Sequence, residues 1–206
     1  MNQFFKIHPE NPQLRLIRQS VEIIKNGGII AYPTDSGYAL GCHLEDKKAL
    51  NKIRTIRNLD KDHNFTLICR DLSEISKYAC FDTPVFRILK AYTPGPYTFI
   101  LQATREVPRR LMHPKQKTVG IRIPDNTIDH ALLGELREPL MTTTLIFPDE
   151  KYPCNDPENI QNRLQNLIEL IIEGGHCGRV PTSVVDLTEK KPKILRKGKG
   201  NIDNFL

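Results

Sequence analysis

The chain has 206 residues and a formal net charge of +6, with 39% hydrophobic and 26% charged residues. This composition supports a packed core and excludes a largely disordered chain. No apolar run approaches the ~20 residues of a membrane-spanning helix, and no signal-like segment opens the sequence. We therefore expect one domain over residues 1–206, soluble and cytoplasmic, without membrane contact.

Periodic apolar residues and capping signals predict a series of helices. The first ends at a Gly-Gly pair, because glycine readily takes the left-handed conformation that closes a helix. Asp46 is a good N-cap for the second helix, and either Asp71 or Ser73 can cap the third. In chain order the predicted helices cover residues 14–25, 46–56, 71–78, 82–91, 126–136 and 157–166.

Short runs of β-branched and aromatic residues predict strands between these helices, the first of them ending at Pro33. Residues 147–158 contain three prolines and predict a mobile loop. Helices and strands interleave without strict alternation, so we predict an α/β fold with a twisted mixed sheet flanked by helices. The predicted strands cover residues 29–32, 38–43, 66–69, 97–102, 118–123, 140–145, 167–172, 183–187 and 193–196.

Several familiar sites are missing from the sequence. It contains no Gly-x-x-x-x-Gly-Lys-Ser/Thr phosphate loop, no Gly-x-Gly-x-x-Gly turn, no Gly-x-Ser-x-Gly elbow and no His-Glu-x-x-His pair. The five cysteines include no Cys-x-x-Cys pair. We therefore expect no metal site, and neither a serine hydrolase nor a metalloenzyme.

Hydroxyl-bearing turns stand at the ends of several predicted strands, and arginines lie close to them in the sequence. Hydroxyl and guanidinium groups suit carboxylate and phosphate oxygens, because arginine offers two parallel donors. For any single threonine an ordinary turn hydrogen bond is the better explanation, but for the set of turns together with two arginines both interpretations remain open. The residues concerned are Thr34, Ser36, Thr98, Thr142 to Thr144, Thr182, Ser183, Arg122 and Arg196.

Basic residues gather in two segments. Residues 105–117 hold Arg105, Arg109, Arg110, Lys115 and Lys117 beside a single acid, Glu106. Residues 190–199 hold six lysines and arginines, Lys197 among them, and no acid. Such clusters are either ordinary solvated surface or an anion-facing rim.

Five ordered segments give a more specific signal. They are Tyr-Pro-Thr-Asp-Ser-Gly-Tyr-Ala-Leu-Gly from Tyr32, Pro-Gly-Pro-Tyr-Thr from Pro94, Ile-Arg-Ile-Pro from Ile121, Thr-Ser-Val-Val-Asp from Thr182 and Ile-Leu-Arg-Lys-Gly from Ile194. Together they resemble the YrdC/YciO family, which includes the threonylcarbamoyl-AMP synthases of tRNA modification. His-Asn-Phe-Thr-Leu at residues 63–67 and the Phe-Phe-x-Ile opening are most similar to the YciO branch.

The resemblance implies a YrdC-like twisted sheet with a basic concave face. Active synthases of the family join threonine, bicarbonate and ATP and release pyrophosphate, with magnesium assisting. By position, Thr34, Arg122, Thr182 and Ser183 would lie on the threonine side, with Arg122 taking the carboxylate. Facing the nucleotide would be Arg57, Thr98, Thr144 and Arg196.

Two departures from the family's pattern concern the reaction itself. Thr55 stands where active members have a lysine, and Ile146 stands where they have an asparagine. Arg54 is a neighbour of Thr55, but one step along a helix turns a side chain by about 100°. Isoleucine neither donates nor accepts a hydrogen bond, so these changes remove contacts to phosphate and magnesium.

Two functional hypotheses follow. In the first, the protein binds double-stranded RNA, tRNA or structured rRNA, retains a threonine and nucleotide pocket, and has weak or no synthase activity. In the second, it is an L-threonylcarbamoyladenylate synthase that uses ATP and magnesium. A hydrolase of a related acyl-adenylate also fits the pocket, but the sequence offers no general base. The RNA contacts in the first hypothesis are Arg105, Arg109, Arg110, Lys115, Lys117 and Lys197.

Overall fold

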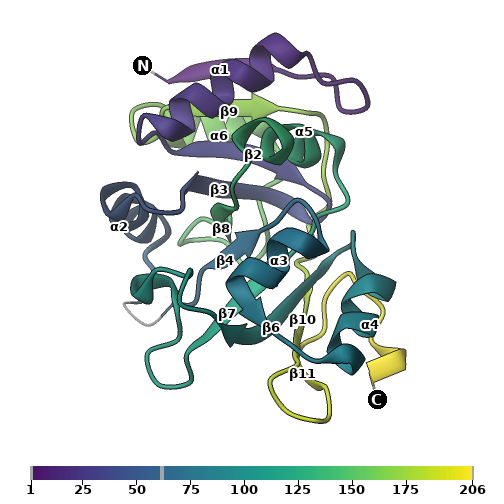
Figure 1. The fold of residues 1–206 in the computed structure, drawn as a ribbon. Helices are drawn as coiled ribbons and strands as arrows, with labels where there is room; N and C mark the ends of the chain where they lie inside the picture. The colour runs from purple at the N-terminus through teal and green to yellow at the C-terminus, as the bar shows by residue number, and fades with distance from the viewer. Residues whose placement is uncertain (1, 61–62, 206) are drawn as a thin grey trace.

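The computed structural model describes residues 2–60 and 63–205 (Figure 1). No helix in this part of the chain is both long and apolar enough to cross a membrane. The α-helices in the described residues are α1 (Leu14–Lys25), α2 (Lys47–Arg57), α3 (Leu72–Tyr78), α4 (Thr83–Tyr92), α5 (Thr127–Leu136) and α6 (Pro157–Leu164). The strands are β1 (Gln3–Lys6), β2 (Ile30–Thr34), β3 (Gly37–His43), β4 (Thr66–Ile68), β5 (Ala79–Cys80), β6 (Tyr97–Ala103), β7 (Thr118–Arg122), β8 (Leu140–Thr144), β9 (Leu170–Glu173), β10 (Ser183–Asp186) and β11 (Lys193–Arg196).

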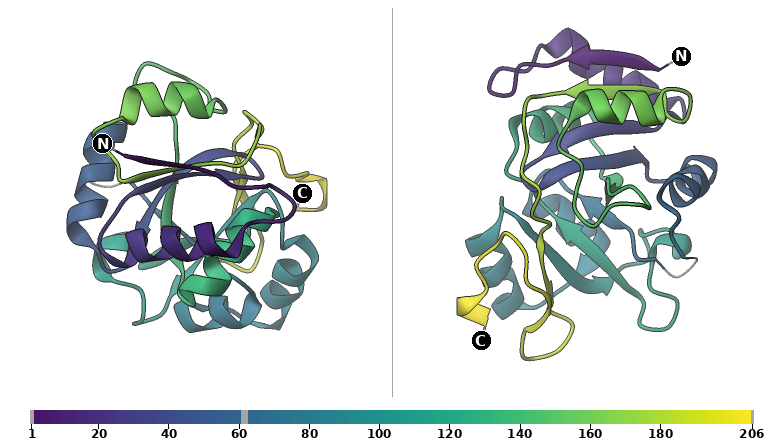
Figure 2. Two further views of the ribbon diagram at one scale, coloured as in Figure 1. Left: turned by 90° about the horizontal axis from the view of Figure 1, so that it is seen from above. Right: turned by 180° about the vertical axis from the view of Figure 1, so that it is seen from behind.

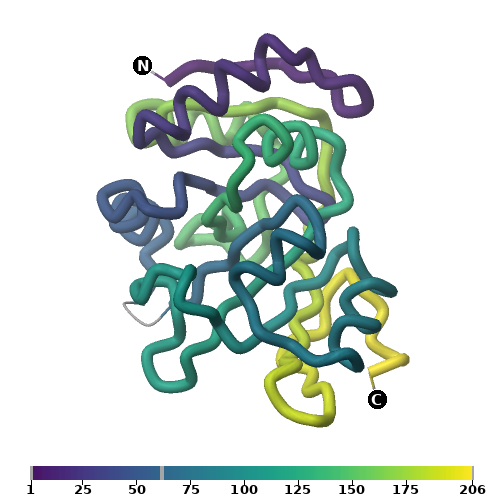
Figure 3. The backbone as a smooth tube through the Cα atoms, viewed as in Figure 1, coloured from purple at the N-terminus to yellow at the C-terminus, as the bar shows by residue number. Residues whose placement is uncertain are grey.

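All of these strands join one mixed sheet, which confirms the predicted α/β architecture. The strand order is β1-β9-β2-β3-β8-β4-β7-β6-β10-β11, and β5 pairs with β6 beside this path. The pairs β1/β9, β2/β9, β4/β7 and β6/β10 are parallel. Since β1 and β11 are the two edges, the N-terminal and C-terminal parts of the chain lie at opposite ends of the sheet (Figure 3).

Helices cover the sheet from two sides. α1 and α5 pack together on one face, and α6 lies across the other (Figure 2). Ile17 of α1 and Leu132 of α5 belong to one buried apolar cluster. Ile160 of α6 belongs to a second cluster, which also contains Phe99 of β6. The apolar stripes that predicted these helices are therefore the faces that they bury.

Local hydrogen bonds fix where the helices begin. The carboxylates of Asp46, Asp71 and Asp82 accept hydrogen bonds from backbone N–H groups three residues further on, at 2.8, 2.8 and 3.0 Å. The amide oxygen of Asn126 caps α5 by accepting from Ile128 N–H at 2.9 Å and from Asp129 N–H at 3.2 Å. Each such cap contributes about 1 kcal/mol. Asp71, rather than Ser73, caps α3.

The structure differs from the predicted elements in several places. β9 begins at Leu170 rather than at Leu167, because Leu167 belongs to the turn that follows α6. β1 and β5 were not predicted. β5 has only two residues and shows no pattern, and β1 joins the sheet at its edge by parallel pairing with β9. β2 continues through Pro33 to Thr34. The missing N–H of Pro33 is tolerated because β9 pairs only with Ile30 and Ala31 on that side.

The irregular segment at residues 147–158 is tied down at its centre. Cys154 is buried, and its backbone N–H donates to Leu145 O at 2.8 Å. Its carbonyl accepts from Tyr38 N–H at 3.1 Å. The segment predicted as a mobile loop is thus irregular but anchored against β3.

Alternation along the central strands separates core side chains from cavity side chains. Phe99, Leu67 and Ile121 lie in the larger apolar cluster, whereas their neighbours Thr98, Thr66 and Arg122 line a cavity. Successive side chains of a strand point to opposite faces, so alternate residues at one part of β4, β6 and β7 face this cavity.

Candidate functional site

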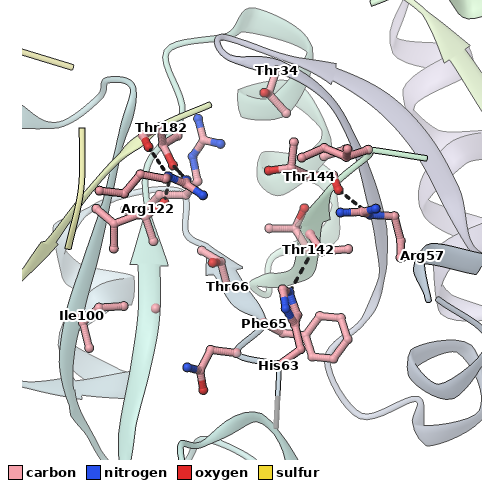
Figure 4. Close-up of a pocket in the computed structure, with 18 of the residues that line it drawn as sticks. Thr34, Arg57, His63, Phe65, Thr66, Ile100, Arg122, Thr142, Thr144 and Thr182 are labelled. Atoms are coloured by element: carbon pink, nitrogen blue, oxygen red, sulfur yellow. Dashed lines mark hydrogen bonds between the residues drawn. The ribbon is translucent and has the colours of Figure 1, made fainter. Parts of the chain in front are cut away.

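A cavity of about 330 Å³ lies among the central and C-terminal strands of the sheet (Figure 4). Hydroxyl groups and guanidinium groups dominate its polar lining, and no carboxylate belongs to the described lining residues. Its lining residues include Thr34, Tyr38, Arg57, His63, Thr66, Thr98, Ile100, Gly120, Arg122, Thr142, Thr143, Thr144, Ile146, Thr182, Val184, Leu195 and Arg196.

The turn between β2 and β3 forms one end of the cavity. The hydroxyl of Thr34 donates to Gly37 O at 2.7 Å and accepts from Ser36 N–H at 3.2 Å. Gly37 has φ of 141°, and a Cβ there would lie 2.7 Å from the side chain of Pro153. Glycine is therefore required at this position by both backbone conformation and space.

Arg122, at the end of β7, already holds a carboxylate. Its Nη2 donates to Asp35 Oδ1, and its Nη1 donates to Ser36 Oγ at 3.4 Å. Both side chains of the Arg122–Asp35 pair are only 7% exposed. The other carboxylate oxygen of Asp35 accepts from Asp125 N–H at 3.0 Å. A ligand carboxylate at Arg122 must share the guanidinium with Asp35.

Arg196 and two threonines form a hydrogen-bonded chain beside Arg122. Arg196 donates from Nε to Thr182 O at 2.9 Å and from Nη2 to Thr182 Oγ1 at 3.0 Å. The Thr182 hydroxyl in turn lies 2.9 Å from that of Thr98. Burial and the neighbouring Arg122 lower the pKa of Arg196 from its usual range.

Arg57 comes from the last turn of α2 and lies on the side of the cavity opposite Arg122 (Figure 4). Its Nε donates to Thr144 O at 2.8 Å, which fixes the guanidinium against β8. Burial lowers the pKa of Arg57 to about 10. Three arginines thus line one cavity; Arg122 is paired with Asp35, whereas Arg57 and Arg196 have no carboxylate partner among the described lining residues, which favours an anionic ligand.

Seven of the eight residues predicted for threonine and nucleotide line this cavity together: Thr34, Arg57, Thr98, Arg122, Thr144, Thr182 and Arg196. Ser183 does not. Its hydroxyl donates to Gly200 O at 2.6 Å and accepts from Gly198 N–H at 3.0 Å, and the residue is fully buried. It anchors the C-terminal segment instead of facing a ligand, because alternation along β10 turns it away from Thr182.

The residues predicted to contact RNA lie outside the cavity. Arg105, Arg109, Lys115, Lys117 and Lys197 are exposed. Arg110 is half-buried, and its Nη2 donates to Leu44 O at 3.0 Å. Arg110 therefore joins the β6–β7 connection to the end of β3, a structural contact that no local sequence pattern indicates.

Asp129 is a buried acid that the sequence analysis did not single out. It lies on the buried face of α5, is fully buried, and neither carboxylate oxygen has a hydrogen-bond partner among the described residues. Burial raises its pKa well above the usual range; nearby Arg122 opposes this shift and Asp35 adds to it. Burial therefore favours the protonated, neutral form of this carboxyl group in the folded protein.

Asp129→Asn should make stability less dependent on pH. A raised carboxyl pKa favours the folded state fully below the unfolded pKa near 4, and this contribution is lost as pH rises toward the folded value. Relative to the variant, the wild type should lose up to about 1.4 kcal/mol of unfolding free energy per pH unit in that window. Urea denaturation at pH 4.5, 5.5 and 6.5 measures the unfolding free energy of both proteins. The same pH dependence of that free energy in the wild type and in Asp129→Asn would contradict the prediction.

Comparison with known proteins places the chain in a family. The Sua5/YciO/YrdC family model, whose description is telomere recombination, matches residues 22–198. The chain is 54% identical to the uncharacterized protein YciO of Escherichia coli K12 over the full length of both. It is 27% identical to the threonylcarbamoyl-AMP synthase of Vibrio vulnificus YJ016, over 88% of this chain and 98% of that one.

Solved structures show the same fold. The crystal structure of E. coli YciO superposes with a TM-score of 0.97, at 54% identity and with full coverage of both chains. P. abyssi Sua5 complexed with L-threonine superposes with a TM-score of 0.86 at 25% identity. That match covers 95% of this chain and 57% of the Sua5 chain.

Proposed function

The chain belongs to the Sua5/YciO/YrdC family, and from this membership and its cavity we propose that it binds an amino-acid carboxylate together with a nucleotide, with little or no synthase turnover. One observation carries the proposal: Arg57, Arg122 and Arg196 converge with threonine hydroxyls on a cavity whose described lining has no carboxylate. Preorganised cations and hydroxyls suit a ligand of the threonylcarbamoyl-AMP class, which has both a carboxylate and a phosphate.

The end of the cavity at Thr34 and Arg122 suits the amino acid. The terminal nitrogens of Arg122 already contact Asp35 and Ser36, but its buried Nε has no hydrogen-bond partner among the described residues. Thr34 and Ser36 place hydroxyls beside this guanidinium. The related P. abyssi Sua5 has been solved with L-threonine. Asp35 lies next to the guanidinium and carries the charge that an α-ammonium group would meet.

The remainder of the cavity suits a nucleotide. Arg57 and Arg196 supply charges for phosphate oxygens, and the Thr98 and Thr144 hydroxyls lie beside them. Ile100, Val184 and Leu195 form an apolar part of the lining. A purine base buries its flat face on such a surface, while its phosphates remain near the arginines.

Two side chains argue against efficient turnover. Thr55 is exposed on α2, is absent from the cavity lining, and bonds back to Asn51 O at 3.2 Å. Ile146 does line the cavity and presents only hydrocarbon. Magnesium prefers carboxylate and phosphate oxygens, and the described lining offers no carboxylate. The cavity therefore does not fit a protein-held magnesium ion.

The test combines binding with turnover. We expect calorimetry to detect L-threonine and ATP binding. With ATP, bicarbonate and threonine present, we expect pyrophosphate release at least about 100-fold slower than by the Vibrio vulnificus synthase, because two transition-state contacts are missing. Turnover equal to that of the synthase would support the full synthase function in tRNA modification instead. Absence of threonine and ATP binding would overturn the proposal.

Restoring the two missing groups should raise activity. Thr55→Lys combined with Ile146→Asn is expected to increase pyrophosphate release by about tenfold or more, because one charged contact contributes about 1.5–3 kcal/mol. The matched control is Thr55→Lys with Ile146→Leu, which restores the charge without the amide and should gain less. Unchanged release in the first double variant would mean that other parts of the site have also diverged.

RNA binding is a second candidate function, favoured by the exposed basic cluster at Arg105, Arg109, Lys115 and Lys117. Its test is the salt dependence of tRNA or double-stranded RNA binding. The logarithm of affinity should fall linearly with the logarithm of salt concentration, because each phosphate contact releases a counterion. Arg109→Glu with Lys115→Glu should weaken binding, whereas Lys25→Glu on α1 should not. Affinity that is unaffected by salt would exclude this function.

A further inference from the structure

His63 occupies a position in the cavity that the proposed function does not yet use. It lies just before β4 and lines the cavity on the side of Arg57 (Figure 4). Its Nε2 is 3.4 Å from Thr143 Oγ1, a long hydrogen bond that leaves the imidazole only loosely held there. Its ring meets Phe65 edge to face, with the ring centres 5.3 Å apart.

Cations dominate the surroundings of this imidazole. Arg57 and Arg54 approach from α2, and the Arg54 guanidinium lies over the Phe65 ring at 5.2 Å from its centre. Asp60 is the opposing acid, while the segment just before β4 contributes the uncharged Phe65 and β8 contributes the uncharged Thr143. Burial, then Arg57 and Arg54, lower the pKa of His63, and Asp60 raises it only in part. The imidazole is therefore neutral at pH 7 in the empty cavity.

An anion placed against Arg57 opposes this lowering of the His63 pKa. A phosphate group there neutralises Arg57, one of the two cations that lower the pKa of His63, and brings negative charge into the cavity that His63 also lines, so the protonated imidazole becomes the better partner. An imidazolium donates from both ring nitrogens, whereas a neutral ring donates from one only. The same ring can thus contact a hydroxyl in the empty state and a phosphate oxygen in the bound state.

We propose that His63 is a proton-linked phosphate contact: an anionic ligand seated at Arg57 binds with uptake of one proton from solution by the His63 imidazole. The inference rests on the proposed nucleotide site and adds a residue whose protonation depends on the charge of the ligand. Protonation of His63 should increase the affinity most for ligands that carry more negative charge near Arg57. Binding should accordingly tighten as pH falls and approach a limit of about tenfold per pH unit.

The test uses a probe whose own charge is constant. The methyl ester of AMP keeps one phosphodiester charge between pH 5.5 and 8, so any pH dependence belongs to the protein. We expect calorimetry on the wild-type protein to show several-fold tighter binding at pH 5.5 than at pH 8, with proton uptake that depends on the buffer. In His63→Gln, which retains a hydrogen-bonding side chain but cannot be protonated, both effects should disappear.

NMR titration of the histidine side chains supplies a direct readout. One imidazole pKa should rise when the probe binds, and the corresponding signal should be missing from His63→Gln. His130→Gln, on α5 and outside the cavity lining, is the matched control and should keep the pH dependence. Binding with an unchanged pH dependence in His63→Gln, or with no imidazole pKa shift, overturns the inference alone. Absence of binding in the wild-type protein overturns the proposed nucleotide site and this inference together.

Discussion

Arg122→Ala should abolish measurable binding of L-threonine and lower the stability of the protein. The guanidinium is the only cation in contact with the buried Asp35 carboxylate among the hydrogen bonds of the described residues. Breaking a buried ion pair by removing one partner costs about 3–5 kcal/mol, because the other charge is left without compensation. Loss of the paired donors to the ligand carboxylate should weaken threonine binding by about 100-fold or more.

Calorimetry and urea denaturation separate the two effects. In the double variant Asp35→Asn with Arg122→Ala, the stranded charge is gone, so stability should largely return while threonine binding should not. Arg122→Lys keeps the charge but loses the planar fork, and we expect intermediate affinity. Threonine affinity of Arg122→Ala within threefold of the wild type would place the carboxylate elsewhere.

Gly198→Ala should disrupt the part of the cavity wall that Thr182 and Arg196 form. A Cβ on Gly198 would lie 2.2 Å from Pro181 O and 2.4 Å from both C and O of Thr182, and these are backbone atoms that cannot rotate away. The C-terminal segment must therefore move away from β10. That movement breaks the bond from Gly198 N–H to Ser183 Oγ and displaces Arg196 from Thr182.

The expected cost is about 3 kcal/mol, combining overpacking with one or two lost hydrogen bonds. Gly134→Ala is the matched control, since Gly134 lies in α5 and a Cβ there meets nothing within 4 Å. Alanine is the better helix former, so this variant should be about 0.5–1 kcal/mol more stable than the wild type. Urea denaturation of both variants measures the contrast, and equal stability would show that the C-terminal segment yields without cost.

The local structure of this protein could be read from its sequence. Asp46, Asp71 and Asp82 mark three helix starts, because an N-cap aspartate accepts a hydrogen bond from the backbone N–H three residues further on. Helices and strands of sufficient length were predicted within one or two residues at most ends, because their periods are set by the backbone itself. β5 and β1 were missed: β5 has only two residues, and β1 is an edge strand whose place depends on its pairing with β9.

The family motifs also determined, from sequence alone, which side chains would be candidates for one site. Thr34, Arg122 and Arg196 do line a single cavity together with Arg57. Their meeting depends on the sheet order, which brings β2, β7 and β11 around the same cavity although they are distant in the chain.

Only the tertiary structure decided which of those side chains already have hydrogen-bond partners within the protein. Arg122 is paired with Asp35 across 87 residues, and Arg110 bonds to Leu44 O across 66. Ser183 faces Gly198 and Gly200 rather than the cavity. Capping and periodicity describe neighbours within a few residues, whereas these partners are chosen by strand pairing and side-chain alternation after the sheet has formed. The sequence thus determined which groups are available, and the fold decided which of them remain open to a ligand.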